Sequence, residues 1–188
     1  MNNKNDKESI NIKKRSFMQN FLNCIYEEKQ NKDYFELVFL CIGTDRLIGD
    51  SFGPLVGTRL KELFEKYNIC NINIYGTLNE NICYTNVDKW IKIINKNHPG
   101  ACIVVIDAAL SKETNIGNIY VKKEKMELAS GLNRHKIIDG NIAIKAVVGK
   151  NYKLAKTNFL SLQNVSLNDV INLSRIVAEG IYEVVKYA

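Results

Sequence analysis

The sequence lacks the segments that mark a membrane or secreted protein. No apolar run approaches the roughly 20 residues that a membrane-spanning helix needs. The first residues, MNNKNDKESINIKKR, are polar and contain no apolar segment of the kind found in a secretory signal. We therefore expect a cytoplasmic protein that has no membrane partner.

Paired cysteines are absent as well. The chain has five cysteines, and none of them forms a Cys-x-x-Cys pair with another. Most structural zinc sites need that spacing, so the sequence predicts no metal cluster held by cysteine. We expect the thiols to be reduced and to serve as small, mostly buried apolar side chains.

The positive charge is not arranged as a nucleic-acid surface. The net charge is +6, and much of the excess lies in the first 15 residues and at 121–125. The sequence has no long basic stripe with interleaved aromatic residues, so we predict no nucleic-acid partner. Its 188 residues suffice for one domain with a proper core. We expect residues 1–13 to be a disordered basic N-terminus and residues 14–188 to form that domain.

Helical and strand-like patterns alternate along the chain. Helical spacing of apolar residues is found at 15–28, 55–67, 87–97 and from Ser166 onward. Short apolar runs typical of buried strands lie at 35–42, 71–75 and 101–106, with further strands at 117–121 and 141–147 and a polar loop between these two. The alternation predicts an α/β fold of three layers, αβα, with helices on both faces of a largely parallel, twisted sheet.

Two acids lie where such a sheet places its ligand site. The loop GTDRLIGDSFGP, Gly43 to Pro54, follows the first buried strand, and Asp107 ends the third. Ligands of open α/β sheets bind beyond the carboxyl ends of the strands. We therefore expect Asp50 and Asp107 to meet in space although they are far apart in the sequence.

The loop does not match a phosphate-binding motif. A P-loop needs the pattern GxxxxGK[ST], in which a lysine reaches the phosphates. Here Gly43 and Gly49 are one residue too far apart, and Asp50 stands where the lysine would be. A carboxylate at that point would repel a phosphate.

A serine nucleophile is a second reading of the same loop. Residues 49–53 match G-x-S-x-G, but a nucleophile elbow sits in a sharp turn directly between strand and helix, and this loop is longer. The reaction also needs a histidine base held by an acid. The chain has two histidines, His98 and His135, and neither belongs to a late D-x-x-H pattern. The simpler role for Ser51 is to cap the helix that follows.

A pair of carboxyl groups is the third reading. Two carboxyls close together do not both ionise cheaply, so one keeps its proton. The ionised group can then take a proton from water while the neutral one donates to a carbonyl oxygen, which is sufficient for amide hydrolysis. The same oxygens, with a histidine, could instead hold a divalent metal ion. Taken singly, Asp50 could be only a helix cap and Asp107 only a turn residue.

The residues around both acids resemble a known family. The segment LCIGTDRLIGDSFGPLVGTRL, Leu40 to Leu60, strongly resembles the first block of the YyaC family of sporulation proteins. IVVIDAAL, Ile103 to Leu110, is similar to its second block, and SGLNRHK, residues 130–136, to its third. That family is more distantly similar to the germination protease of spores and to the hydrogenase-maturation endopeptidases. The resemblance implies a phosphorylase/hydrolase-like fold for one peptidase-like domain.

The resemblance also implies roles for individual residues. In the germination protease two aspartates at matching places are thought to be catalytic, which implies that role for Asp50 and Asp107. In the maturation enzymes the matching acids and a histidine bind nickel, so the alternative is a nickel or zinc ion held by Asp50, Asp107 and His135. Otherwise no cofactor is expected. Residues of the motif blocks that would contact substrate are Asp45, Arg46, Ser51, Asn133, Arg134 and His135. For Asp45 and Arg46, a salt bridge that shapes the loop is an equal alternative.

Two segments depart from the family pattern. The third block lacks the usual proline and first glycine, and the usual Gly-Gly-Phe is replaced by Thr157, Asn158 and Phe159. Three functions remain open. The first is a sporulation peptidase that hydrolyses a protein substrate in the cytoplasm of the mother cell or forespore. The others are a metal-sensing maturation-type endopeptidase and a non-catalytic binding or assembly protein. Relatives suggest that the chain could also form a homo-oligomer.

Overall fold

A mixed five-stranded sheet forms the middle layer of the structure. The computed structural model describes residues 2–30, 36–70, 72–128 and 135–186. The strands lie in the order β2-β1-β3-β7-β4, and all pairs are parallel except β7 with β4. Their bounds are Leu37–Cys41 (β1), Ile72–Tyr75 (β2), Cys102–Ser111 (β3), Ile119–Lys122 (β4) and Ile142–Lys150 (β7).

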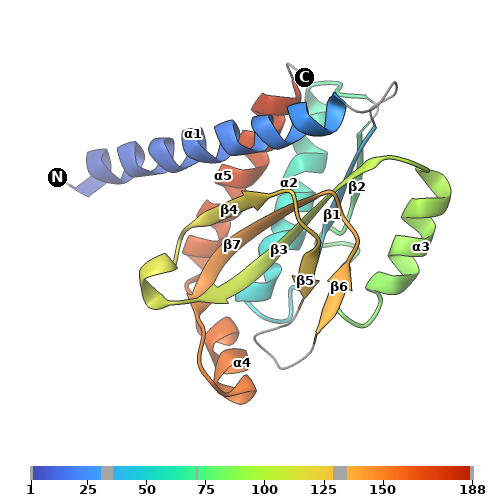
Figure 1. The fold of residues 1–188 in the computed structure, drawn as a ribbon. Coiled ribbons are helices and arrows are strands. Elements are labelled where there is room, and N and C mark those ends of the chain that lie inside the picture. Colours follow the sequence, from blue (N-terminus) through green and yellow to red (C-terminus); the bar gives the residue numbers. More distant parts are fainter. Residues whose placement is uncertain (1, 31–35, 71, 129–134, 187–188) are drawn as a thin grey trace.

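Helices cover both faces of this sheet (Figure 1). On one face, α1 (Asn2–Lys29), α2 (Phe52–Lys66) and α5 (Leu167–Val185) enclose the larger apolar core. On the other, α3 (Val87–Asn97) and a hairpin of β5 (Met126–Leu128) and β6 (Lys136–Ile138) enclose a smaller one. The predicted three-layer α/β fold with a largely parallel sheet is therefore confirmed.

The sheet core follows from side-chain alternation. All five residues of β1 are buried, as expected for a central strand that is covered on both faces. Phe39 packs in the larger core, while Val38 and Leu40 pack in the smaller one. Along β3, Val105 faces the smaller core, so Asp107, two residues further on, faces the same side.

Several elements differ from the sequence expectations. The N-terminal helix, expected at 15–28, runs from Asn2 to Lys29 and so covers the segment expected to lack regular structure. β3 continues through Ser111, so that Asp107 lies inside the strand and not at its end. The loop expected between 121 and 141 contains the β5–β6 hairpin, and α4 (Ala155–Gln163) was not predicted. The last helix begins as expected, because the Asp169 backbone N–H donates to Ser166 Oγ at 3.3 Å.

Two glycines let α2 pack closely against the strand ends. A Cβ atom at Gly53 would overlap the carbonyl oxygen of Ile42, just after β1. A Cβ atom at Gly57, one turn further along α2, would overlap the carbonyl oxygen of Gly76, just after β2. The backbone of the helix therefore lies directly on the carboxyl ends of two strands, and this fixes the loop that carries Asp50.

Replacing Gly57 with alanine tests this contact. Alanine is the better helix former by about 1 kcal/mol. The overlap is with backbone, which cannot rotate away, so the steric cost should exceed that gain. We expect Gly57→Ala to lower the free energy of unfolding by roughly 1–3 kcal/mol, measured by chemical denaturation. Lys61→Ala, at an exposed position of the same helix, is the control and should change it by less than about 0.5 kcal/mol.

Candidate active site

One pocket receives both predicted acids. Its volume is about 310 Å³, and it lies where β1 ends beneath the β5–β6 hairpin. Residues of β3, β5, β7 and α4 and of the surrounding loops line it: Ile42, Gly43, Asp50, Cys83, Tyr84, Asp107, Ala108, Ala109, Leu110, Glu127, Leu128, Lys145 and Leu162. The structure thus brings together two carboxyls that 57 positions of sequence separate.

Asp107 is held by the sheet itself. Its side chain is buried, and its Oδ1 accepts a hydrogen bond of 2.9 Å from the backbone N–H of Ala108. On the neighbouring strand β7, Lys145 is its direct register partner, so both side chains leave the sheet on the same face. The Lys145 ammonium in turn donates to Glu124 Oε1 at 3.2 Å.

Asp50 is held by a tightly folded loop. It lies in a 3-10 turn, η1 (Gly49–Ser51), that leads directly into α2. The backbone N–H of Thr44 donates to the carbonyl oxygen of Asp50 at 3.1 Å, which closes the loop. Gly43 has a φ of 144°, and a Cβ atom there would overlap the same Asp50 carbonyl oxygen. Glycine at 43 is therefore required for the loop to return to the end of β1.

The pocket raises the pKa of both carboxyls. Burial raises the pKa of Asp50 from 3.8 to about 6, against a hydrogen bond from the Thr44 backbone that favours the ionised form. Burial, and then the nearby charge of Asp50, raise the pKa of Asp107 well above its usual value. The Ala108 N–H and the Lys145 ammonium act in the opposite direction on Asp107. Asp50 therefore ionises before Asp107.

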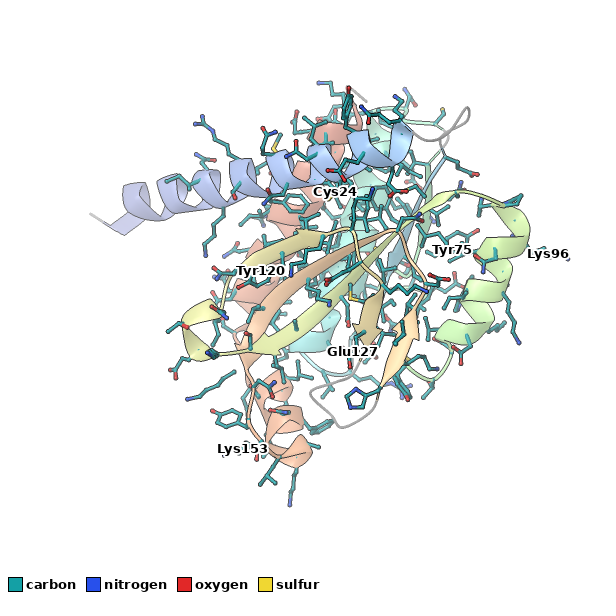
Figure 2. All side chains as sticks on the ribbon, viewed as in Figure 1. Cys24, Tyr75, Lys96, Tyr120, Glu127 and Lys153 are labelled. Atoms are coloured by element: carbon teal, nitrogen blue, oxygen red, sulfur yellow. The ribbon has the colours of Figure 1, made fainter. Side chains whose placement is uncertain are left out.

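Four polar residues of the pocket were not singled out from the sequence. Lys145 lies beside Asp107, Glu127 enters from β5 (Figure 2), and Cys83 and Tyr84 come from the loop before α3. The sequence around Lys145 did not indicate that this side chain lies next to Asp107. That position depends on the register between β3 and β7, which a single sequence does not give. Glu127 lies in the segment that was expected to be a loop.

The predicted substrate-contacting residues of the loop lie outside the pocket lining. Asp45 and Arg46 are exposed, and Asp45 Oδ1 accepts a hydrogen bond of 2.8 Å from the Asn81 side chain. Ser51 is buried, and its hydroxyl donates to the Ile48 carbonyl oxygen at 2.6 Å. The expected helix cap by the Ser51 side chain is not formed, since that hydroxyl points back to the preceding turn. Asn133 and Arg134 lie outside the described residues.

Both histidines have partners away from the serine. His98 Nδ1 lies 2.7 Å from Glu36 Oε1, and its Nε2 lies 2.8 Å from the Tyr75 hydroxyl. His135 is largely exposed, and its Nδ1 lies 2.7 Å from Glu127 Oε1. The arrangement offers Ser51 no histidine base, so the serine-nucleophile interpretation loses its second component.

The three proposed metal ligands do not form one group in the described part of the chain. Within the described ranges, no three His, Cys, Asp or Glu side chains come close enough together to hold one. His135 pairs with Glu127 at the pocket lining and does not join the two aspartates in such a group. The proposed ligand set Asp50, Asp107 and His135 is therefore not assembled, and we derive no step through a metal.

The segment that replaces the family's Gly-Gly-Phe has a structural task here. Thr157, Asn158 and Phe159 lie in the first half of α4. The buried Asn158 side chain accepts from the Tyr152 backbone N–H at 2.6 Å and donates to the Tyr152 carbonyl at 3.0 Å. It therefore fixes the chain between β7 and α4, whose Leu162 lines the pocket.

Comparisons with known proteins agree with the motif blocks and the fold. Residues 9–180 match a family described as a protein of unknown function, DUF1256. The chain belongs to this family. It is 30% identical over 145 residues to the uncharacterized protein YyaC of Bacillus subtilis (strain 168), a match that covers 77% of this chain and 67% of that protein.

A solved structure shares the fold of this DUF1256 chain. It is the NiFe hydrogenase maturation protease HycI from Thermococcus kodakarensis KOD1, with a TM-score of 0.58 and 19% sequence identity. The similarity covers 86% of this chain and 99% of that one. At this identity it establishes a shared fold. As a separate finding, no helix in the described part of the chain is long and apolar enough to span a bilayer.

The raised pKa of Asp50 predicts a pH-dependent gain of stability in Asp50→Asn. The native chain holds the Asp50 proton more tightly than the unfolded chain does, so protonated Asp50 stabilises the fold. This stabilisation is full below about pH 4 and is lost as pH rises through about 6. Asparagine removes that loss. Relative to wild type, the free energy of unfolding of Asp50→Asn should therefore rise by roughly 3 kcal/mol between pH 4 and pH 8.

Urea denaturation at several pH values measures this difference. Asp45→Asn is the matched control, because it removes a carboxylate from the exposed part of the same loop. An equal pH dependence in both variants would show that the effect does not come from burial in the pocket.

Proposed function

We propose that this protein is a peptidase-like hydrolase that cleaves a peptide bond of a protein substrate with Asp50 and Asp107. The observation that carries the proposal is that both carboxyls line one pocket and that both have raised pKa values. Perturbed acids that share a cleft are typical of acid–base catalysis. The fold shared with a hydrogenase maturation protease supports the same reaction class.

The unequal pKa values assign the two roles. Near neutral pH Asp50 is ionised, and Asp107 keeps its proton because it is more deeply buried and faces the Asp50 charge. The Asp50 carboxylate accepts a proton from water as the water oxygen bonds to the scissile carbonyl carbon. Asp107 donates its proton to the carbonyl oxygen, which yields a neutral tetrahedral intermediate.

Collapse of that intermediate restores both acids. Asp107 takes back the proton of one hydroxyl as the carbonyl re-forms, and Asp50 gives its proton to the departing amine nitrogen. One water is consumed, the C–N bond is broken, and a carboxyl and an amine end are released. Lys145 lies beside Asp107 and lowers the pKa of that carboxyl. Asp107 therefore stays acidic enough to transfer its proton.

The cellular setting is proposed from the motif resemblance. The blocks around Asp50 and Asp107 resemble those of a family of sporulation proteins, and on that resemblance we propose a protein substrate made during sporulation, in the mother cell or forespore. The metal-dependent alternative and a non-catalytic binding role remain predictions from the sequence, as does self-association. The metal-dependent alternative and the binding role give different results in the following experiment.

Comparison of protein termini in sporulating cells tests the proposal. Cells carrying wild type, Asp50→Asn, Asp107→Asn or Asp139→Asn are compared by mass spectrometry of protein ends. Asp139 is an exposed aspartate outside the pocket lining. We expect one or more precursors to remain uncut with either pocket variant and to be processed with wild type and Asp139→Asn. Normal processing by Asp50→Asn and Asp107→Asn would contradict hydrolysis by these acids and favour the binding role. His135→Ala is added because the metal-dependent alternative requires that side chain.

The purified protein should show two ionisations in its pH–rate profile. Cleavage of the precursor should increase as pH rises through about 6, where Asp50 ionises. It should decrease at higher pH, where Asp107 loses its proton. A rate that is independent of pH between 5 and 7 would be inconsistent with Asp50 as the base, and loss of activity with a chelator would favour the metal-dependent alternative.

A further inference from the structure

At the pocket, β3, the strand that carries Asp107, extends beyond the end of its neighbour β1. The β1–β3 ladder ends with Cys41 opposite Ile106, whereas β3 continues to Ser111. The last four residues of β3 are all partly exposed, unlike the buried run before them. Three of them, Ala108, Ala109 and Leu110, line the pocket with the two acids. Among the described residues, β3 therefore has an edge without a partner strand in the interior of the sheet, next to the candidate catalytic groups (Figure 1).

The hydrogen bonds on either side show which backbone groups face this gap. The Ile106 carbonyl accepts from the Ile42 N–H at 2.8 Å, so Ile106 directs its backbone groups toward β1. The Ser111 carbonyl accepts from the Asn151 N–H at 2.7 Å, so Ser111 directs its groups toward β7. Backbone direction alternates along a strand. The β3–β7 register shifts between Ala109 and Leu110, where β7 has one extra residue, but Ser111 still points as the alternation from Ile106 requires. Ala108 and Leu110 therefore direct their backbone groups toward the side from which β1 is missing.

Part of this edge is already in use. The Ala108 N–H donates to Asp107 Oδ1 at 2.9 Å. The Ala108 carbonyl and both backbone groups of Leu110 remain directed into the gap. β1 does not extend to them, because the chain turns after Ile42 and the Gly43 N–H donates to the Ile82 carbonyl at 2.7 Å. Backbone groups in such a place need a partner, since an unpaired polar group is costly away from water.

We propose that an extended segment of the protein substrate adds to β3 as a short strand along Ala108–Leu110, and so places its scissile bond beside Asp107 and Asp50. This inference rests on the proposed function, because it names how the substrate of that same site is held. Strand addition supplies backbone hydrogen bonds that do not depend on sequence, and alternate side chains then reach separate pockets.

The surroundings of the edge suit an extended chain. Ala108 and Ala109 are small, so another backbone can approach closely. One set of substrate side chains would face Leu110 and Leu162, which are apolar, and the alternate set would face Glu127 on the hairpin side. We therefore expect segments with apolar residues at every second position.

Amide exchange in the free protein tests the geometry. Ala109 is in register with Val147 and directs its N–H toward β7. Leu110 is in register with Gly149, but by the alternation between Ile106 and Ser111 its N–H is directed into the gap. In NMR hydrogen exchange at neutral pH, the Leu110 amide should exchange at least about tenfold faster than the Ala109 amide. Equal protection of the two amides would mean that Leu110 already has a partner, which would overturn the inference.

Binding of defined peptides tests the occupant. Random twelve-residue peptides are selected by display against the full-length Asp50→Asn chain, which retains the edge and should not cleave them. Selected peptides are then resynthesised with one N-methyl group at each backbone position in turn. Methylation at alternate positions should weaken binding about tenfold, and methylation at the positions between them should have little effect. Bound peptide should also slow exchange of the Leu110 amide.

The possible outcomes separate this inference from the proposed function. If no peptide is selected, or if methylation effects do not alternate, strand addition is wrong whatever the enzyme cleaves. If the alternation is found and wild type does not cut the bound peptides or any cellular precursor, the edge is a binding site and hydrolysis is wrong. The methyl groups are placed in the peptide and the protein is not changed between measurements. A folding defect, of the kind that a protein variant such as Leu110→Pro would risk, therefore cannot account for the result.

Discussion

Two carboxyl groups that are close together and partly or fully buried do not both ionise at low free-energy cost. Asp50 and Asp107 line one pocket, and each has a raised pKa. The remainder of the site follows from that constraint. Lys145 and the Ala108 N–H limit the shift on Asp107, while the Thr44 backbone limits it on Asp50. The difference between the two surroundings gives one acid and one base from identical side chains.

The sequence was most informative where local pattern and topology agree. Alternating apolar strands and amphipathic helices predicted the α/β layers, and the carboxyl-end rule predicted that Asp50 and Asp107 would meet. Both are long-range results that need no knowledge of side-chain packing. Two of the three glycines of the Gly43–Pro54 loop are also explained, because Gly43 and Gly53 each lie against backbone atoms that leave no room for a Cβ.

Other features depended on contacts that a single sequence does not contain. Lys145 is at the site only because β7 pairs with β3 in one register. Strands as short as β5 and β6, at three residues each, give too little alternation to be recognised. Ser51 looked like a cap or nucleophile, but its hydroxyl is held by Ile48 in the 3-10 turn. The length of β3 beyond β1, on which the substrate-binding inference depends, is likewise a property of the paired strands.

The long N-terminal helix α1 bears on whether two molecules can pair through the edges of their sheets. α1 packs against α5 and against β4, the outer antiparallel strand. Lys123, just after β4, forms ion pairs with Glu27 and Glu28 of this helix, and Lys13 donates to the Gly117 carbonyl. An uncovered outer strand invites pairing between molecules. By packing against β4, the helix discourages pairing between the sheets of two molecules at that outer strand.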